Sequence, residues 1–184
     1  MARRVLVFVY GTLKRGEPNA SIMADLVTGM QRFIGTGKTV NAYPLIIASE
    51  YNIPFCLDKP GIGNRISGEL YEVDEQKLEV LDEFEGHPTF YRRQPQQFQL
   101  YEADEQKLEV LDEFEGHPTF YRRQPQQVEM DHNGTTVTAW IYMLPKWTPN
   151  LLQSSSNYLE TYNSNGPHNR PYIQGENCQC LDDL

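Results

Sequence analysis

The sequence lacks a long hydrophobic run. The apolar stretch near its N-terminus, Val5–Val9, is short and is interrupted at once by Tyr10 and Gly11. A membrane-spanning helix needs about 20 predominantly apolar residues, and the apolar part of a secretory signal needs about 7–15. No later run in the 184 residues approaches a membrane span. We therefore expect neither a signal peptide nor a membrane-spanning segment.

Cysteine is also scarce. The three cysteines are Cys56, Cys178 and Cys180, and such an odd, sparse set does not indicate a disulfide framework. Cys178 and Cys180 lie in a polar tail without neighbouring histidines, whereas structural zinc sites combine four cysteine or histidine ligands. We therefore expect no metal site. Because thiols stay reduced in the cytosol, the composition favours a cytoplasmic location.

Basic residues are outnumbered. The chain has 16 Lys and Arg against 25 Asp and Glu, which gives a formal net charge of −9 at pH 7. Proteins that bind nucleic acids neutralise phosphates with clustered Lys and Arg, and anionic membranes attract the same residues. We therefore expect no nucleic-acid partner and no membrane partner.

Much of the acidity comes from a segment that occurs twice. Tyr71–Gln97 is repeated as Tyr101–Gln127, and the copies differ only where Val73 is replaced by Ala103. Each copy contains seven acidic and three basic residues, so each contributes a charge of −4. Two units do not make a solenoid, which needs about three or more repeats. Near-identity indicates a recent tandem duplication, although two alternative exons in one transcript or a gene-model error would look the same.

Short apolar segments between turns predict a single α+β domain built on a sheet or barrel. The continuous β-branched run at 4–10 indicates a buried central strand. Asp74 suits the start of a helix that ends before Gly86, and Asn133-Gly134 marks the tip of a hairpin. We expect a disordered tail at 174–184. Further predicted strands cover 43–48, 53–57, 65–73, 120–130 and 135–144, and predicted short helices cover 21–28, 75–85 and 151–161.

One acid of the repeated helix falls on its apolar side. Leu78, Leu81 and Glu85 are spaced i, i+3 and i+7 and therefore share one stripe. Burial and the negative end of the helix dipole both raise the pKa of a carboxyl group, as a general base near neutral pH requires. The pattern alone still favours a structural role, as a partly exposed glutamate at a frayed helix end. Glu115 holds the same position in the second copy.

The segment after the first strand, Tyr10–Gly16, reads YGTLKRG and turns sharply. A glycine-containing turn at a strand end can aim consecutive backbone N–H groups into a concavity that holds a carboxylate. Taken alone, however, the pattern favours an ordinary turn.

Four separated motifs together resemble a known family. The segments VFVYGTLKRGEPN (7–19), YPLIIASEYNIPF (43–55), GELYEVDEQKLEVLDEFEG (68–86) and YNSNGPHNRPY (162–172) occur in the order found in the gamma-glutamylamine cyclotransferases. These enzymes form part of the AIG2-like branch of the gamma-glutamylcyclotransferase superfamily. The resemblance covers nearly all of the chain except the second copy and the last residues. The YGTL loop, in place of the YGSN loop of the general branch, favours the gamma-glutamylamine branch.

The resemblance implies a small closed mixed β-barrel with a few short helices. It implies an enzyme that releases 5-oxoproline and a free amine from a small gamma-glutamyl substrate, such as gamma-glutamyl-ε-lysine, without a metal or cofactor. We expect a monomer. The family's catalytic acid is the glutamate of the D-x-F-E motif, which is Glu85 in the first copy and Glu115 in the second. The family's loop for the glutamyl group corresponds to Tyr10, Gly11, Thr12 and Leu13.

Two other functions stay open. The first is a cyclotransferase with a different leaving group, which would act on gamma-glutamyl amino acids. The second is a catalytically silent AIG2-like binding module, whose site is blocked by the extra segment.

The family's fold needs one copy of the repeated segment, so about 30 residues within 86–120 are predicted to be surplus. The strand before the first helix is continuous with that helix, while the final hairpin needs the end of the second copy. We therefore predict a hybrid of the two copies that places Glu85 in the site. In the alternative, Glu115 occupies the site and 94–103 imitates the strand before the helix, which Pro95 disfavours in a sheet interior.

Overall fold

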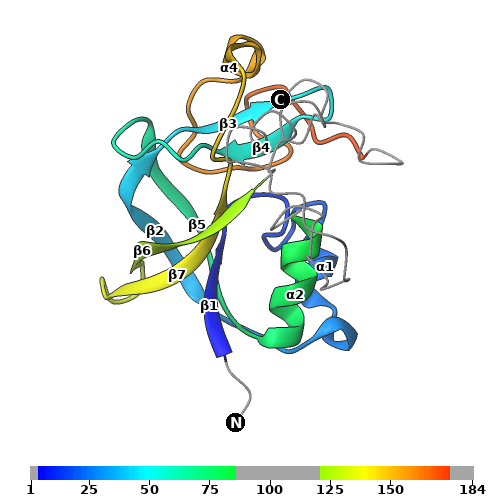
Figure 1. The fold of residues 1–184 in the computed structure, drawn as a ribbon, viewed down its shortest axis with the longest axis vertical. Helices are drawn as coiled ribbons and strands as arrows, with labels where there is room; N and C mark the ends of the chain where they lie inside the picture. Colours follow the sequence, from blue (N-terminus) through cyan, green and yellow to red (C-terminus); the bar gives the residue numbers. More distant parts are fainter. Residues whose placement is uncertain (1–3, 86–120, 175–184) are drawn as a thin grey trace, which may run out of the picture.

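The computed structural model of the protein describes residues 4–85 and 121–174. Within them, five strands close into a barrel in the order β1-β5-β2-β6-β7 (Figure 1). Neighbouring strands are antiparallel, except that β7 runs parallel to β1. The predicted α+β class and the small closed mixed barrel are therefore confirmed. The barrel strands are β1 (Arg4–Val9), β2 (Gln31–Tyr43), β5 (Asn64–Asp74), β6 (Arg122–Met130) and β7 (Thr136–Met143).

A two-stranded sheet and short helices complete the described fold. Strands β3 and β4 pair antiparallel, which confirms the predicted pairing of 43–48 with 53–57. This sheet and α4 lie at one end of the barrel, at the top of Figure 1, whereas α1 and α2 lie along its side. These elements are β3 (Leu45–Ala48), β4 (Ile53–Cys56), α1 (Ala20–Ala24), the 3₁₀ turn η1 (Leu26–Thr28), α2 (Glu75–Phe84) and α4 (Pro149–Ser154).

Strand β1 is buried on both faces, as its unbroken apolar run predicts. Val7 and Val9 pack in the cluster that includes Leu81 of α2, while Phe8 and Tyr10 pack in the core cluster of the barrel strands. Successive side chains of a strand point to opposite faces, so only a strand covered on both sides needs apolar residues throughout. The end of β1 therefore delivers Tyr10 into the interior.

Helix α2 is fixed at its start by two polar side chains, those of Asp74 and Lys77. The carboxylate of Asp74 accepts a hydrogen bond from the amide of Lys77 at 2.9 Å, which confirms the predicted N-cap. The ammonium group of Lys77 is buried and donates to the carbonyl of Ile22 at 3.1 Å and to the hydroxyl of Thr28 at 2.6 Å. These bonds hold α2 against α1 and η1. Gly86, predicted to stop the helix, lies outside the described residues.

The β6–β7 hairpin also forms as predicted. Asn133 and Gly134 lie in the connection, where Gly134 adopts a positive φ of 67°. The side chain of Asn133 accepts a hydrogen bond from the amide of Thr135 at 2.9 Å, a local bond that favours the turn.

The sequence did not predict β2. Its residues are largely polar and include Gly35 and Gly37, which usually weaken a strand. At Gly37 a Cβ atom would lie 2.5 Å from the carbonyl oxygen of Glu129, so glycine is what allows β6 to approach. Tyr43, expected to begin the next strand, belongs to β2, and the following residue is proline. Barrel closure therefore overrides the local signal.

Two helix predictions were too long. The helix expected over 21–28 divides at Asp25, whose extended backbone ends α1 and whose carboxylate accepts from the amide of Val27. The helix expected over 151–161 ends at Ser154. Serine hydroxyls compete for backbone groups at that end: Ser155 donates to the carbonyl of Leu152 at 2.9 Å.

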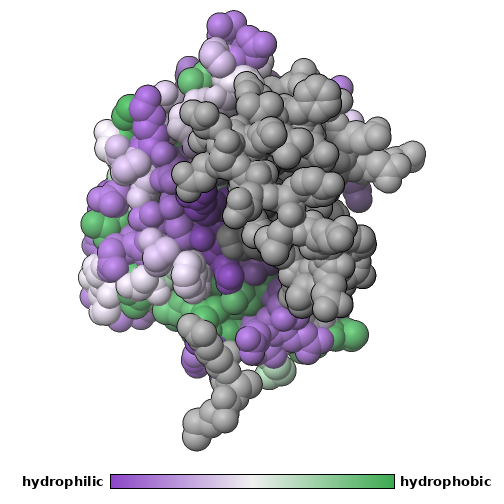
Figure 2. Space-filling model, viewed as in Figure 1, coloured by the Kyte–Doolittle hydropathy of each residue, from purple (hydrophilic) through white to green (hydrophobic). Residues whose placement is uncertain are grey.

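The visible surface of the described residues is mainly polar, with a hydrophobic band below the centre of the view (Figure 2). None of the helices in the described ranges has the length and apolar character needed to cross a bilayer. The predicted tail at 174–184 lies outside the described residues except for its first position.

Candidate active site

Glu85 lies at the C-terminal end of α2. Its amide donates to the carbonyl of Leu81 at 2.9 Å, so its backbone still belongs to the last helical turn. The residue as a whole is only partly buried, yet its carboxyl group is withdrawn from water, and this burial raises the pKa of Glu85 to about 8. A carboxyl group with this pKa can exchange a proton with an amine near neutral pH.

The charge of Glu85 contributes to a raised pKa at two buried tyrosines, Tyr10 and Tyr142. Burial raises the pKa of Tyr10 well above its usual value, and the nearby Tyr121, Cys56 and Glu85 add to the effect. The hydroxyl of Tyr10 donates to the backbone carbonyl of Tyr142 at 2.8 Å and accepts from the amide of Cys56 at 3.3 Å. The predicted loop residue and the predicted acid are thus brought into one electrostatic environment, with the phenol of Tyr10 neutral and fixed.

Tyr142 is the second of these tyrosines. Burial is the largest cause of its raised pKa. The hydrogen bond to Asp82 and the charges of Asp82 and Glu85 raise that pKa further. Its hydroxyl donates to the carboxylate of Asp82 at 2.6 Å. Neither Tyr142 nor Asp82 was predicted from the sequence, because Tyr142 looks like an ordinary core position of β7 and Asp82 like part of a charged helix face.

The predicted glutamyl loop begins at Tyr10 and comes close to β4. At Gly11 a Cβ atom would lie 3.0 Å from the Cγ atom of Pro54, so glycine allows the close approach. Within the part of the chain that the structure describes, the amides of Gly11, Thr12 and Leu13 donate no hydrogen bond. Consecutive free amides of this kind suit a carboxylate ligand.

A buried carboxylate fixes the loop immediately after these amides. Glu69 of β5 accepts from the amide of Arg15 at 3.0 Å, from the Nε atom of Arg15 at 3.1 Å and from the hydroxyl of Tyr71 at 2.9 Å. The guanidinium of Arg15 also lies 3.7 Å from the centre of the Phe33 ring. The loop is therefore tied to two barrel strands.

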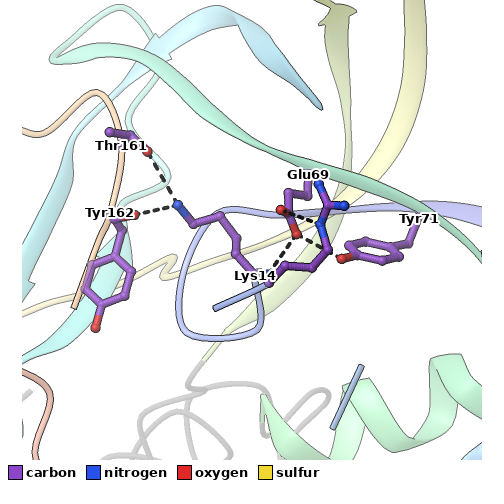
Figure 3. A network of polar contacts seen from close by, with 6 residues as sticks. Lys14, Glu69, Tyr71, Thr161 and Tyr162 are labelled. Atoms are coloured by element: carbon purple, nitrogen blue, oxygen red, sulfur yellow. Dashed lines mark hydrogen bonds and ion pairs between the residues drawn. The ribbon is translucent and has the colours of Figure 1, made fainter. Parts of the chain in front are cut away.

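Lys14 ties the other side of the loop to the C-terminal segment. Its ammonium group donates to the backbone carbonyl of Tyr162 and lies 3.4 Å from the hydroxyl oxygen of Thr161, in the direction away from Glu69 and Tyr71 (Figure 3). Burial lowers the pKa of Lys14. Segments far apart in the sequence thus hold the turn in one conformation.

No cluster of His, Cys, Asp and Glu suited to a metal ion occurs in residues 4–85 and 121–174. Cys56 is buried as a free thiol, and burial raises its pKa, so it is not a thiolate nucleophile. Glu115, Cys178 and Cys180 lie outside the described residues.

Position 68, just before the repeated segment, distinguishes the two ways of placing the copies in the fold. In the alternative that uses the second copy, Phe98 aligns with Gly68, and Gln99 aligns with Glu69. A Cβ atom at Gly68 would lie 2.5 Å from the carbonyl oxygen of Val9, so no larger residue fits there without moving β1. A glutamine in place of Glu69 would also lose the ion pair with Arg15.

Comparisons with known proteins identify the family of the chain. The family model described as gamma-glutamyl cyclotransferase, AIG2-like, matches residues 7–100 and 97–163. The chain belongs to this family.

Gamma-glutamylaminecyclotransferases from other organisms match almost the whole length of the chain. The gamma-glutamylaminecyclotransferase of Rattus norvegicus is 39% identical over 171 residues, which are 93% of this chain and 97% of the relative. That of Homo sapiens is 37% identical over 172 residues, or 94% and 98%. The crystal structure of an AIG2-like protein from Mus musculus has a TM-score of 0.68 at 36% identity and covers 95% of this chain and 99% of that chain. The predicted family and the cyclotransferase class of enzyme are confirmed.

Proposed function

We propose that this cyclotransferase releases 5-oxoproline and a free amine from gamma-glutamyl amines such as gamma-glutamyl-ε-lysine, and that Glu85 moves the protons. The observation that carries the proposal is the carboxyl group of Glu85, which burial brings to a pKa of about 8 beside Tyr10 of the YGTL loop. The names of the relatives support the gamma-glutamyl amine as substrate.

The reaction is a ring closure within the substrate. Its α-amine attacks its own γ-carbonyl carbon, forming the C–N bond of the ring, and the amide bond to the leaving amine breaks. Intramolecular attack in a well-oriented chain has an effective molarity on the order of 10⁵ M or more. The protein therefore has to hold the glutamyl chain bent and to transfer protons.

Glu85 serves both nitrogens. An ammonium group cannot attack, so the Glu85 carboxylate first removes a proton from it. Each proton that the attacking nitrogen loses is passed by Glu85 to the leaving nitrogen. The attacking nitrogen goes from ammonium to ring amide and the leaving nitrogen from amide to ammonium, so the protons balance and Glu85 ends as it began.

The glutamyl group is held by the loop of Tyr10, Gly11, Thr12 and Leu13. The substrate's α-carboxylate is an anion, and consecutive amides without a protein partner match it. Glu69 and Lys14 keep these amides in place because, directly after the three amides, Glu69 holds Arg15 and Lys14 binds the carbonyl of Tyr162.

The hybrid of the two copies supports Glu85 rather than Glu115 as the acid. Helix α2 comes from the first copy and follows directly on β5, whereas β6 comes from the second copy. Val73, where the first copy differs, is fully buried, and Ala103 in its place would leave a cavity. About 30 residues within 86–120 are then surplus. The protein acts as a monomeric cytoplasmic enzyme in this proposal.

The test is the release of 5-oxoproline by the purified full-length protein. Gamma-glutamyl-ε-lysine is compared with gamma-glutamyl-alanine and with buffer alone, and product is measured by chromatography. Faster release from gamma-glutamyl-ε-lysine is expected. Faster release from gamma-glutamyl-alanine would replace the leaving group with an amino acid. Binding of either compound without release would instead identify a silent binding module.

A further inference from the structure

Three side chains from three elements meet one turn before Glu85. Tyr142 of β7 donates from its hydroxyl to the Oδ1 atom of Asp82 at 2.6 Å. The Nε atom of Arg123 of β6 lies 3.2 Å from the same oxygen, and both charged side chains are less than one-fifth exposed. The guanidinium of Arg123 in turn lies 5.1 Å from the centre of the Trp140 ring. A hydrogen bond to a charged group and an ion pair that are mostly buried fix the positions of their side chains more firmly than exposed surface pairs do.

This arrangement is placed to control Glu85. Residues i and i+3 of a helix lie on neighbouring parts of one face, so fixing Asp82 fixes the rotation of the turn that carries Glu85. The backbone carbonyl of the same Tyr142 accepts the hydroxyl of Tyr10 at 2.8 Å. One strand residue therefore contacts the helix through its side chain and the glutamyl loop through its backbone.

Two of these residues also join the two copies of the repeated segment. Asp82 belongs to the first copy and Arg123 to the second. The equivalent of Asp82 in the second copy is Asp112, and the equivalent of Arg123 in the first copy is Arg93. The pair described in the structure takes one partner from each. Tyr142 lies outside both copies.

We propose that Asp82, Tyr142 and Arg123 form a positioning clamp, which joins the two copies and aims Glu85 at the substrate. The catalytic role of the clamp rests on the proposed function, whereas its geometry is independent of that function. Asp82, Tyr142 and Arg123 act as positioning residues and transfer no proton.

The duplication supplies a matched control for testing the clamp. Asp82→Asn removes the charge that Tyr142 and Arg123 hold, while Asp112→Asn makes the same change within an identical local sequence. Initial rates with gamma-glutamyl-ε-lysine give kcat and KM. For Asp82→Asn we expect kcat to fall about 10- to 100-fold, because small misplacements of a reacting group cost that much. KM should change less than about threefold, since the glutamyl loop is untouched. Asp112→Asn should match the wild type.

A second measurement does not depend on activity. The carboxyl ¹³C signal of Glu85, assigned by its loss in Glu85→Gln, is titrated in each variant. Among the described residues, Tyr10 at the end of β1 and Tyr142 of β7 interact electrostatically with Glu85, and Asp82 and Arg123 act on Tyr142. In Asp82→Asn the carboxyl group should meet water, and its midpoint should move at least about one pH unit lower. If Asp82→Asn does not fold by near-ultraviolet circular dichroism, Tyr142→Phe replaces it with the same expectations.

The outcomes separate the clamp from the proposed function. Loss of kcat and a lowered midpoint in Asp82→Asn alone support the clamp. An unchanged midpoint in Asp82→Asn overturns it, and equal effects of Asp82→Asn and Asp112→Asn overturn the joining of the two copies. If the wild type releases no 5-oxoproline, the proposed function fails, while the titration still decides whether the clamp holds Glu85.

Discussion

Glu85 and Asp82 lie one helical turn apart, yet their surroundings differ. Asp82 has a phenol and a guanidinium against its carboxylate, whereas burial dominates at Glu85 and raises its pKa to about 8. Two carboxyl groups on one helix can therefore take different roles, one engaged in polar contacts with β6 and β7 and one able to exchange protons near neutral pH.

The pH dependence of activity follows from this difference. In the proposed mechanism Glu85 must be ionised to accept the first proton, and its raised pKa places that ionisation near pH 8. We therefore expect kcat/KM to fall about tenfold for each pH unit below about 8. The measurement is the pH profile of 5-oxoproline release at low substrate concentration. An acidic limb near pH 4.5, the ordinary range of a glutamate, would contradict a buried base.

Glu69 offers a separate prediction for the loop. Glu69→Gln removes the charge that holds Arg15, so we expect KM to rise about tenfold and the free energy of unfolding to fall by about 1–3 kcal/mol. Urea unfolding and steady-state kinetics measure both. The control is Glu129→Gln, which breaks the more exposed pair with Arg65 and should cost less than about 1 kcal/mol. Equal effects of the two changes would show that Glu69 does not position the loop.

At the scale of elements, local chemistry predicted what local chemistry controls. The apolar run of β1, the cap of α2 and the Asn133-Gly134 turn each depend on neighbouring residues, and each was predicted from the sequence. Strand β2 was missed, because its glycines serve close approaches to β6 that only the closed barrel creates. The lengths of α1 and α4 were missed for a different, local reason, since side chains there compete for backbone groups.

The cap of α2 can be tested with a control from the second copy. Asp74 accepts from the amides of Lys77 and Met30 at 2.9 and 3.0 Å. We expect Asp74→Ala to lower the free energy of unfolding by about 1–2 kcal/mol. Asp104→Ala, the identical change in the second copy, should cost less than about 0.5 kcal/mol. Chemical denaturation of both variants measures this, and a larger loss in Asp104→Ala would place the second helix in the fold.

At the scale of the whole molecule, the site depends on residues that no local pattern connects. The sequence, through family resemblance, supplied Glu85 and the loop at Tyr10 as candidates for the site. It could not supply Tyr142, because only the closed barrel and the packing of α2 bring that residue to Asp82 and Tyr10. Residues 69 and 15 meet for the same reason. Long-range polar contacts of this kind depend on topology, which a single sequence does not display.

Removing one copy tests the domain as a unit. Deletion of 86–115 leaves one uninterrupted copy that retains Glu85 and Val73. We expect this shorter chain to fold and to release 5-oxoproline at the wild-type rate. Its free energy of unfolding should rise by about 1–2 kcal/mol, because a shorter connection costs less entropy to close.

Deletion of 71–100 leaves the same chain with alanine for Val73. It should be less stable than the first deletion by about 1–2 kcal/mol, because Val73 is buried. Loss of folding in both would mean that the extra residues belong to the domain.

The most direct measurement compares two identical substitutions in the two copies. 5-Oxoproline release from gamma-glutamyl-ε-lysine is measured for the wild type, Glu85→Gln and Glu115→Gln at the same pH. We expect Glu85→Gln to lose at least about 10²-fold in kcat, as loss of a general base does, and Glu115→Gln to retain wild-type activity. Activity lost only in Glu115→Gln would put the second copy in the site, and full activity in both would rule out a glutamate as the proton carrier.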